Sequence, residues 1–295
     1  MKVRAGVHAT KKKIRVVLWD GAAVVGKHKR GHRSESLAEL TAAVAEAVQE
    51  VLEAHAEGAE VDGLGLALPA YVRQEDGVVT ASTDLSWLVG QSVTAALSER
   101  LQVPVKADVE AHCAVWGRYL EPIIEHKRDL PTLALTSTLY GGAAFIIDGE
   151  ILHGEGAEGF EFGALLQRLT GESDGGDDVG AFTLSALVRL LAAKRGLKLK
   201  KKDAFVEACQ KAAKGNERAA AVLEEAAAPI GVMIRAMRRT EELKETDCFH
   251  VLHAASAEDE VGEFFMPVTM AASCYLSQSS TNPTKFDVAR GAAQL

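Results

Sequence analysis

Short β-branched, apolar runs separated by polar turns open the chain, and they predict an antiparallel meander of strands at Val3–Val7, Ile14–Trp19 and Ala22–Gly26. Residues Ser36–His55 then place apolar side chains at helical spacing along one face of a predicted helix. Val61–Leu68 is an apolar run typical of a buried strand. A helix, a short strand and a second helix complete this half, at Val93–Leu101, Val103–Lys106 and about Val109–Leu120. The predicted order is therefore β-β-β-α-β-α-β-α.

A similar pattern begins again near Pro131. Strands are predicted at Thr132–Thr136, Gly142–Ile147 and Glu150–Leu152, and Asp148-Gly149 marks a hairpin turn. Further elements follow: alanine-rich helices at about 181–195, 203–214 and 216–240, a strand at Cys248–Leu252, and helices near 259–272 and over Pro283–Gln294. Two such halves predict an α/β chain with a two-lobed, actin-like ATPase (ribonuclease H-like) fold and a central cleft, where ligands usually bind. We expect an N-terminal lobe at 1–121 and a C-terminal lobe at 122–295. The last helix, about 283–294, is a candidate for packing back on the first lobe.

Composition excludes several classes of function. A chain of 295 residues that is 47% hydrophobic can bury a large core, while a net charge of −8 and only 5% aromatics argue against nucleic-acid binding. No apolar run approaches the roughly 18 residues of a membrane helix, and Met1–Val7 is too short and polar for a signal peptide. The four cysteines are widely spaced without a CxxC pair, a pattern of reduced thiols. We therefore expect a cytoplasmic protein with no membrane or nucleic-acid partner.

Five segments carry a more specific signal: Gly63–Val72, Asp76–Trp87, Val103–Asp108, Gly141–Gly149 and Gly154–Gly163. In this order and at matching intervals they resemble characteristic stretches of the sugar kinases of the ROK (repressor, open reading frame, kinase) family. Ala70 stands where that family usually has glycine, and Asp84 where it has asparagine. The resemblance implies ATP-dependent phosphorylation of a sugar hydroxyl, and assembly into a homodimer or higher homo-oligomer.

The resemblance assigns three carboxylates to the sugar side. Asp108 takes the place of the catalytic base, which accepts the proton of a sugar hydroxyl; an N-cap for the following helix is the alternative role. Glu161 matches the sugar-binding glutamate, with an ordinary surface carboxylate as the alternative. Asp84 could accept a hydroxyl hydrogen bond, whereas Ala107 replaces an asparagine and removes a polar contact. The predicted sugar pocket is reduced but not erased.

The loops that should hold phosphate depart much further from the family. Such loops need glycine because a Cβ blocks close approach of the backbone to phosphate. The corresponding positions are His8, Thr10 and Lys11 in the first loop, Thr138, Gly141 and Gly142 in the second, and Ala254 in the third. Only Gly141 and Gly142 are still glycines, and they follow Leu139 and Tyr140. Leu139 and Tyr140 would occupy space that phosphates need. Lys11–Lys13 could attract phosphates as point charges, with a solvated hairpin turn as the alternative.

The zinc motif that is common in the family is also missing. Gly163-Ala164 replaces its Gly-His, and no cysteine follows between Leu165 and Val179. His112 lies one turn from Asp108, a spacing that suits a metal, although an isolated helical histidine is usually structural. We therefore expect no zinc and no metal ligands.

Two functions remain in competition. The first is a ROK-like protein with impaired or lost ATP phosphotransfer, no cofactor, and a cleft that binds a small sugar or metabolite or is vestigial and serves an oligomer. The alternative is an active, divergent ATP-dependent hexose or N-acetylhexosamine kinase that uses Mg-ATP and Asp108 as base. A repressor is disfavoured because the first strand begins at Val3, which leaves no room for a DNA-binding domain.

Overall fold

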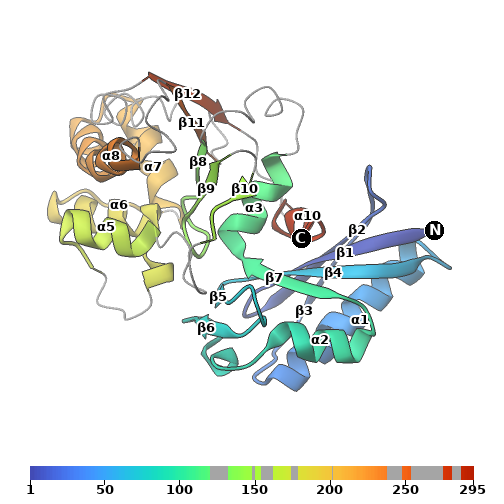
Figure 1. Cartoon of the computed structure of the whole chain (residues 1–295). Coiled ribbons are helices and arrows are strands. Elements are labelled where there is room, and N and C mark those ends of the chain that lie inside the picture. Colours follow the sequence, from blue (N-terminus) through green and yellow to red (C-terminus); the bar gives the residue numbers. More distant parts are fainter. Residues whose placement is uncertain are drawn as a thin grey trace. The chain divides into compact units, whose positions relative to one another are not determined.

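The computed structural model describes residues 1–119, 132–147, 150–153, 162–173, 179–200, 202–237, 248–253, 275–280 and 287–295 (Figure 1). These residues form two units. The first contains the described residues of 1–125, 153–160 and 284–295, and the second those of 126–152 and 161–283. Within the described part of the chain, every helix is too short or too polar to cross a lipid bilayer.

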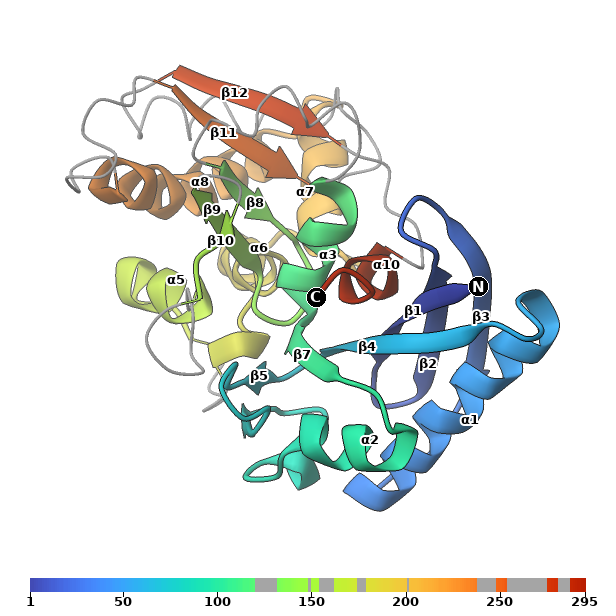
Figure 2. The same ribbon diagram turned by 45° about the vertical axis from the view of Figure 1, so that its right-hand side comes forward.

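The first unit is built on a five-stranded sheet, whose strands are labelled in Figure 2. Its strands, in spatial order, are β3 (Val24–Gly31), β2 (Lys13–Trp19), β1 (Lys2–Ala9), β4 (Glu60–Leu68) and β7 (Val105–Val109). Strands β1, β4 and β7 are parallel, while β2 and β3 pair antiparallel. The other elements are α1 (Leu37–His55), α2 (Val93–Leu101), α3 (Glu110–Tyr119), α10 (Asp287–Ala292), the turn η1 (Ser86–Leu88) and a small hairpin of β5 (Tyr71–Val72) and β6 (Val79–Ala81).

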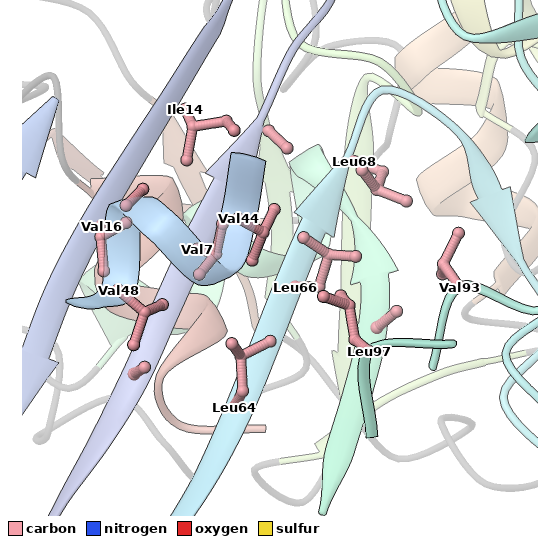
Figure 3. Packing of buried hydrophobic residues seen from close by; sticks show 14 of the residues in the cluster. Val7, Ile14, Val16, Val44, Val48, Leu64, Leu66, Leu68, Val93 and Leu97 are labelled. Atoms are coloured by element: carbon pink, nitrogen blue, oxygen red, sulfur yellow. The ribbon is translucent and has the colours of Figure 1, made fainter. Parts of the chain in front are cut away.

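One face of this sheet forms an apolar core with α1 and α2 (Figure 3). Alternate residues of a strand point to the same face of the sheet, and Val7 and Leu66 point to the face that α1 and α2 cover, where they are fully buried. Val44 and Val48, one turn apart on α1, pack on them. Helix α1 begins where Ser36 Oγ accepts the Glu39 N–H at 3.2 Å, which satisfies one of the free amides of the first turn.

The opposite face is covered by α10 at two glycines. Gly6 and Gly65 are paired in the β1–β4 register. A Cβ on Gly6 would lie 1.9 Å from Ala289 O, and one on Gly65 would lie 1.5 Å from Ala292 O. The helix backbone therefore rests directly on the strand backbones, and α10 also packs on α3.

The second unit repeats the strand order of the first. Its sheet runs β10 (Glu150–Ile151), β9 (Ala143–Ile147), β8 (Thr132–Leu135), β11 (Cys248–His253) and β12 (Tyr275–Ser280). Its helices are α5 (Phe162–Thr170), α6 (Leu184–Lys194), α7 (Ala204–Ala212) and α8 (Glu217–Met237), with a short turn η2 (Val179–Ala181).

Some sequence-based bounds need correction. The third strand lies at Val24–Gly31, not at Ala22–Gly26, because the polar residues at its end still pair with β2. The strand before α3 runs to Val109, so Asp108 lies within the strand, one residue from its end, and does not open a helix. The strand β12, the helix α5 and the β5–β6 hairpin were not predicted. The turn predicted at 148–149 and the helix predicted near 259–272 lie outside the described residues.

Candidate functional site

Three parallel strands of the first unit end at the same edge of the sheet, and polar side chains gather there. The register pairs His8 of β1 with Ala67 of β4, and Ala67 with Asp108 of β7. Paired residues point to the same face, and neighbouring strands lie about 4.8 Å apart. His8 and Asp108 therefore project from one face with only the small Ala67 side chain between them. Ligands of open α/β sheets bind at this carboxyl edge, which makes it the candidate site.

Asp108 is buried and both of its carboxylate oxygens are hydrogen-bonded. Its Oδ1 lies 3.0 Å from His112 Nδ1 and accepts the Val109 N–H at 2.7 Å, while Oδ2 lies 2.8 Å from His153 Nε2. Burial by itself would raise the pKa of Asp108, but the charge and hydrogen bonds of His112 and His153 outweigh it and hold the pKa well below its usual range. The carboxylate is therefore ionised, and both oxygens already serve as acceptors.

His8 belongs to a second buried pair beside this group. His8 Nε2 lies 2.5 Å from Glu110 Oε1, and Arg15 Nη1 lies 3.3 Å from His8 Nδ1. Since a guanidinium only donates, His8 Nδ1 accepts and Nε2 carries the proton that Glu110 accepts. His8, named above as a position of the first phosphate loop, is therefore a histidine that donates to a buried carboxylate. Burial, together with the charges of Asp108 and Glu110, raises the pKa of the nearby Cys113 thiol, which stays protonated.

Asp84 lines a different part of the first unit. It is exposed, and it borders a pocket of about 960 Å³. The pocket is lined by Lys11, Lys12, Gly31, His32, Arg33, Ser34, Glu35, Thr83, Asp84, Ser86 and Trp87. Asp108 is not among the described residues that line it. Asp84 therefore lines one pocket together with Lys11 and Lys12 of the first loop, whereas Asp108 is hydrogen-bonded to His112 and His153.

In the turns that correspond to the first two phosphate loops, backbone amides donate hydrogen bonds to carbonyl groups of the same unit. In the turn between β1 and β2, the Thr10 N–H donates to Lys13 O at 2.9 Å. In the turn between β8 and β9, the Gly142 N–H donates to Leu139 O at 3.0 Å, and the Gly141 N–H donates to Gly180 O at 2.9 Å. Thr138 lies exposed in this second turn.

Side chains also fill the space around the second turn. Tyr140 is buried, and a Cβ on Gly180 would lie 2.4 Å from its ring. A Cβ on Gly142, whose φ is +70°, would lie 2.7 Å from the ring of Phe162. Both glycines therefore face an aromatic ring of the second unit. Glu161 and Ala254, predicted for the sugar and nucleotide sides, lie outside the described residues.

Sequence reasoning missed His153 and Glu110. His153 follows β10 and lies 45 residues from Asp108, while Glu110 lies 102 residues from His8. No local spacing connects such distant residues, and only the fold brings them together.

Solved structures with the same fold define the class of the protein. A ROK hexokinase from Thermus thermophilus superimposes with a TM-score of 0.75 at 16% identity, over 99% of this chain and 96% of the other. A ROK glucokinase from Streptomyces griseus, in complex with glucose and AMPPNP, gives 0.65 at 17% identity over 99% and 98%. A ROK family transcriptional regulator, a homolog of the E. coli MLC protein, gives 0.73 at 14% identity over 99% and 77%. The chain thus has the actin-like ATPase fold of sugar kinases, as predicted.

The sequence profile of the ROK family matches residues 4–240. The chain belongs to the ROK family, which confirms the resemblance drawn from its five segments. Among proteins with curated functions, none matches the sequence significantly.

Proposed function

We propose that this ROK protein has lost ATP-dependent phosphotransfer and binds a small sugar or metabolite without phosphorylating it. The observation that carries the proposal is the state of Asp108, whose two oxygens accept from His112 and His153. A general base must accept the proton of the substrate hydroxyl at hydrogen-bond distance. Here each oxygen already accepts from a histidine, and these histidines hold the pKa of Asp108 well below its usual range, which makes it a weaker acceptor for the proton of a sugar hydroxyl.

The phosphate turns support the same proposal. The amides of Thr10, Gly141 and Gly142 donate within their own units. An amide that turned to a phosphate oxygen would leave its present acceptor carbonyl without this donor, which costs about 1–3 kcal/mol where that carbonyl is buried, as at Gly180. Phosphoryl transfer depends mainly on positioning and on stabilisation of charge, and these turns offer neither in the described conformation.

The pocket beside Asp84 supports retained ligand binding. It combines an acceptor (Asp84), an aromatic surface (Trp87) and the cationic side chains of Lys11, Lys12 and Arg33. An aromatic face can pack on the C–H groups of a sugar ring, a carboxylate can accept from its hydroxyls, and the cations can pair with an acidic substituent. The solved ROK glucokinase holds glucose, which supports a sugar as the class of ligand to test first.

Thermal denaturation of the full chain with separate ligands tests the proposal. We expect no stabilisation by Mg-ATP, and stabilisation by at least one member of a panel of hexoses, N-acetylhexosamines and sugar acids. A ligand at about 100 times its Kd stabilises by about 2.7 kcal/mol. Asp84→Ala should remove the sugar effect, while Glu75→Ala, a change at an exposed carboxylate that does not line the pocket, should keep it. A clear shift with Mg-ATP, or a sugar effect untouched by Asp84→Ala, would contradict the proposal.

The alternative, an active divergent kinase, is favoured by one observation: Asp108 is present and ionised at the carboxyl end of β7. A coupled assay of ADP release with the same panel separates the two functions. Activity that Asp108→Asn abolishes without unfolding the chain would establish the kinase. The absence of turnover together with sugar binding would establish the binding protein.

A further inference from the structure

Three metal-binding side chains converge in the first unit. Asp108, His112 and His153 each offer one donor atom, and these three atoms lie within 4.8 Å of one another. The two imidazole rings stand nearly perpendicular, with centroids 5.1 Å apart, and each places a ring nitrogen at hydrogen-bond distance from the Asp108 carboxylate.

The distances suit coordination with little rearrangement. In a tetrahedral zinc site with metal–ligand bonds of about 2.0–2.2 Å, two donor atoms lie roughly 3.4 Å apart. The Asp108 Oδ1–His112 Nδ1 and Asp108 Oδ2–His153 Nε2 distances are 3.0 and 2.8 Å. Each histidine nitrogen would move about half an ångström away from its carboxylate oxygen to reach this value, and the three donor atoms start within 4.8 Å of one another. A fourth donor would come from water, a bound ligand or a further side chain.

The positions of the ligands favour a defined site with a route of entry. Asp108 lies at the buried end of β7 and His112 lies in the first turn of α3, and both side chains are more than 90% buried. Packing thus fixes the two ligands before an ion arrives, which lowers the cost of binding. The side chain of His153 is 32% exposed and gives solvent access to the group.

We propose that Asp108, His112 and His153 bind a divalent transition-metal ion, with Zn²⁺ as the first candidate. Two imidazoles and one carboxylate form a donor set that zinc and neighbouring ions prefer over Mg²⁺ or Ca²⁺, which take oxygen ligands. The site differs from the zinc motif whose absence led us to expect no metal, because it uses no cysteine and none of the residues of that motif. The spacing of His112 from Asp108 was considered from the sequence, and His153 supplies a third ligand. The inference does not depend on the proposed sugar binding.

Titration of the chelator-treated full chain with Zn²⁺ and Co²⁺ tests the site. We expect one ion per chain, measured against a chromophoric chelator, and for Co²⁺ the intense visible absorption of a four-coordinate ion. His153→Gln should weaken binding by at least about 100-fold, since loss of an outer-shell partner alone costs 10–100-fold. This variant should fold, because the side chain is partly exposed. His112→Gln should have the same effect on binding, and circular dichroism would verify that both variants are folded.

His28→Gln is the matched control. His28 also lies beside a carboxylate, with Nε2 2.7 Å from Glu50 Oε2, and its side chain is 30% exposed, close to the value for His153. This variant should keep the affinity of the wild type. The proposal is overturned if the wild-type chain binds no ion stoichiometrically, if His153→Gln binds as tightly as the wild type, or if His28→Gln loses as much affinity. All arms use the metal alone, so failure here leaves the sugar-binding experiment unaffected.

Discussion

Substitution of Gly65 by alanine should loosen α10 from the sheet of the first unit. Gly65 lies in β4, and the added Cβ would come within 1.5 Å of Ala292 O and 2.4 Å of Ala292 C. Both atoms belong to the helix backbone, so no side-chain rotation can relieve the contact. An ordinary carbon contact needs about 3.5 Å, and α10 must therefore move by about 2 Å.

The size of the effect follows from what α10 buries. Its buried side chains are Val288, Ala289, Ala292 and Ala293. At about 0.8 kcal/mol per buried carbon, one valine and three alanines contribute up to about 5 kcal/mol. A gap of about 1 Å already removes up to half of a contact's attraction, while alanine in a strand recovers about 0.5–1 kcal/mol of chain entropy relative to glycine. We expect Gly65→Ala to lower the free energy of unfolding by roughly 2–4 kcal/mol.

Urea denaturation followed by circular dichroism measures this loss, and carboxypeptidase digestion with mass spectrometry reports whether α10 has become accessible. Gly63→Ala is the control in the same strand, because its Cβ would meet only Pro104 O at 3.8 Å, an ordinary contact. That variant should be as stable as the wild type or slightly more stable. Equal stability of the two variants, with α10 equally protected from digestion, would refute the proposed docking of α10 on Gly65.

Two further substitutions test other contacts by urea denaturation. Glu110→Ala removes the buried acceptor of the His8 proton and should lower the free energy of unfolding by about 1–3 kcal/mol. Glu50→Ala changes a carboxylate that is 45% exposed and should lower it by no more than about 1 kcal/mol. Equal losses of stability would argue against a buried His8–Glu110 pair. At Gly171 φ is +68° and nothing lies within 4 Å of an added Cβ, so Gly171→Ala should lower the free energy of unfolding by about 1–2 kcal/mol through backbone strain alone. At Gly142 φ is +70° and the Phe162 ring lies 2.7 Å from the added Cβ, so Gly142→Ala should lower it by more. Similar losses for the two glycines would show that the ring yields.

Periodicity predicted the elements that bury one face. The helix predicted at 36–55 and the strand predicted at 61–68 agree with α1 and β4 to within one residue, because apolar residues recur there at the spacing that packing requires. The pattern failed where a strand has no apolar period that could be recognised. The strand Tyr275–Ser280 is mostly polar, and the hairpin strand Tyr71–Val72 is too short to show a period.

The candidate site was predictable only in part, for a different reason. Asp108 was found through the family resemblance, and His112 through its spacing from Asp108 along the chain. His153 and Glu110 reach their partners through tertiary structure, across 45 and 102 residues. The sequence shows which residue types are present, but the strand register decides which of them meet at the carboxyl edge.

The polar groups at this edge also weigh against a merely vestigial site. Asp108, His112, His8 and Glu110 are all buried there. Replacement of buried ionic groups by apolar residues of similar volume is often neutral or stabilising, whereas loss of one partner from such a group is costly. Stability alone therefore does not explain why this edge contains so many ionisable side chains. Their arrangement is accounted for if the edge still binds something, and the donor set of Asp108 and its two histidines indicates that a metal ion is the first ligand to test.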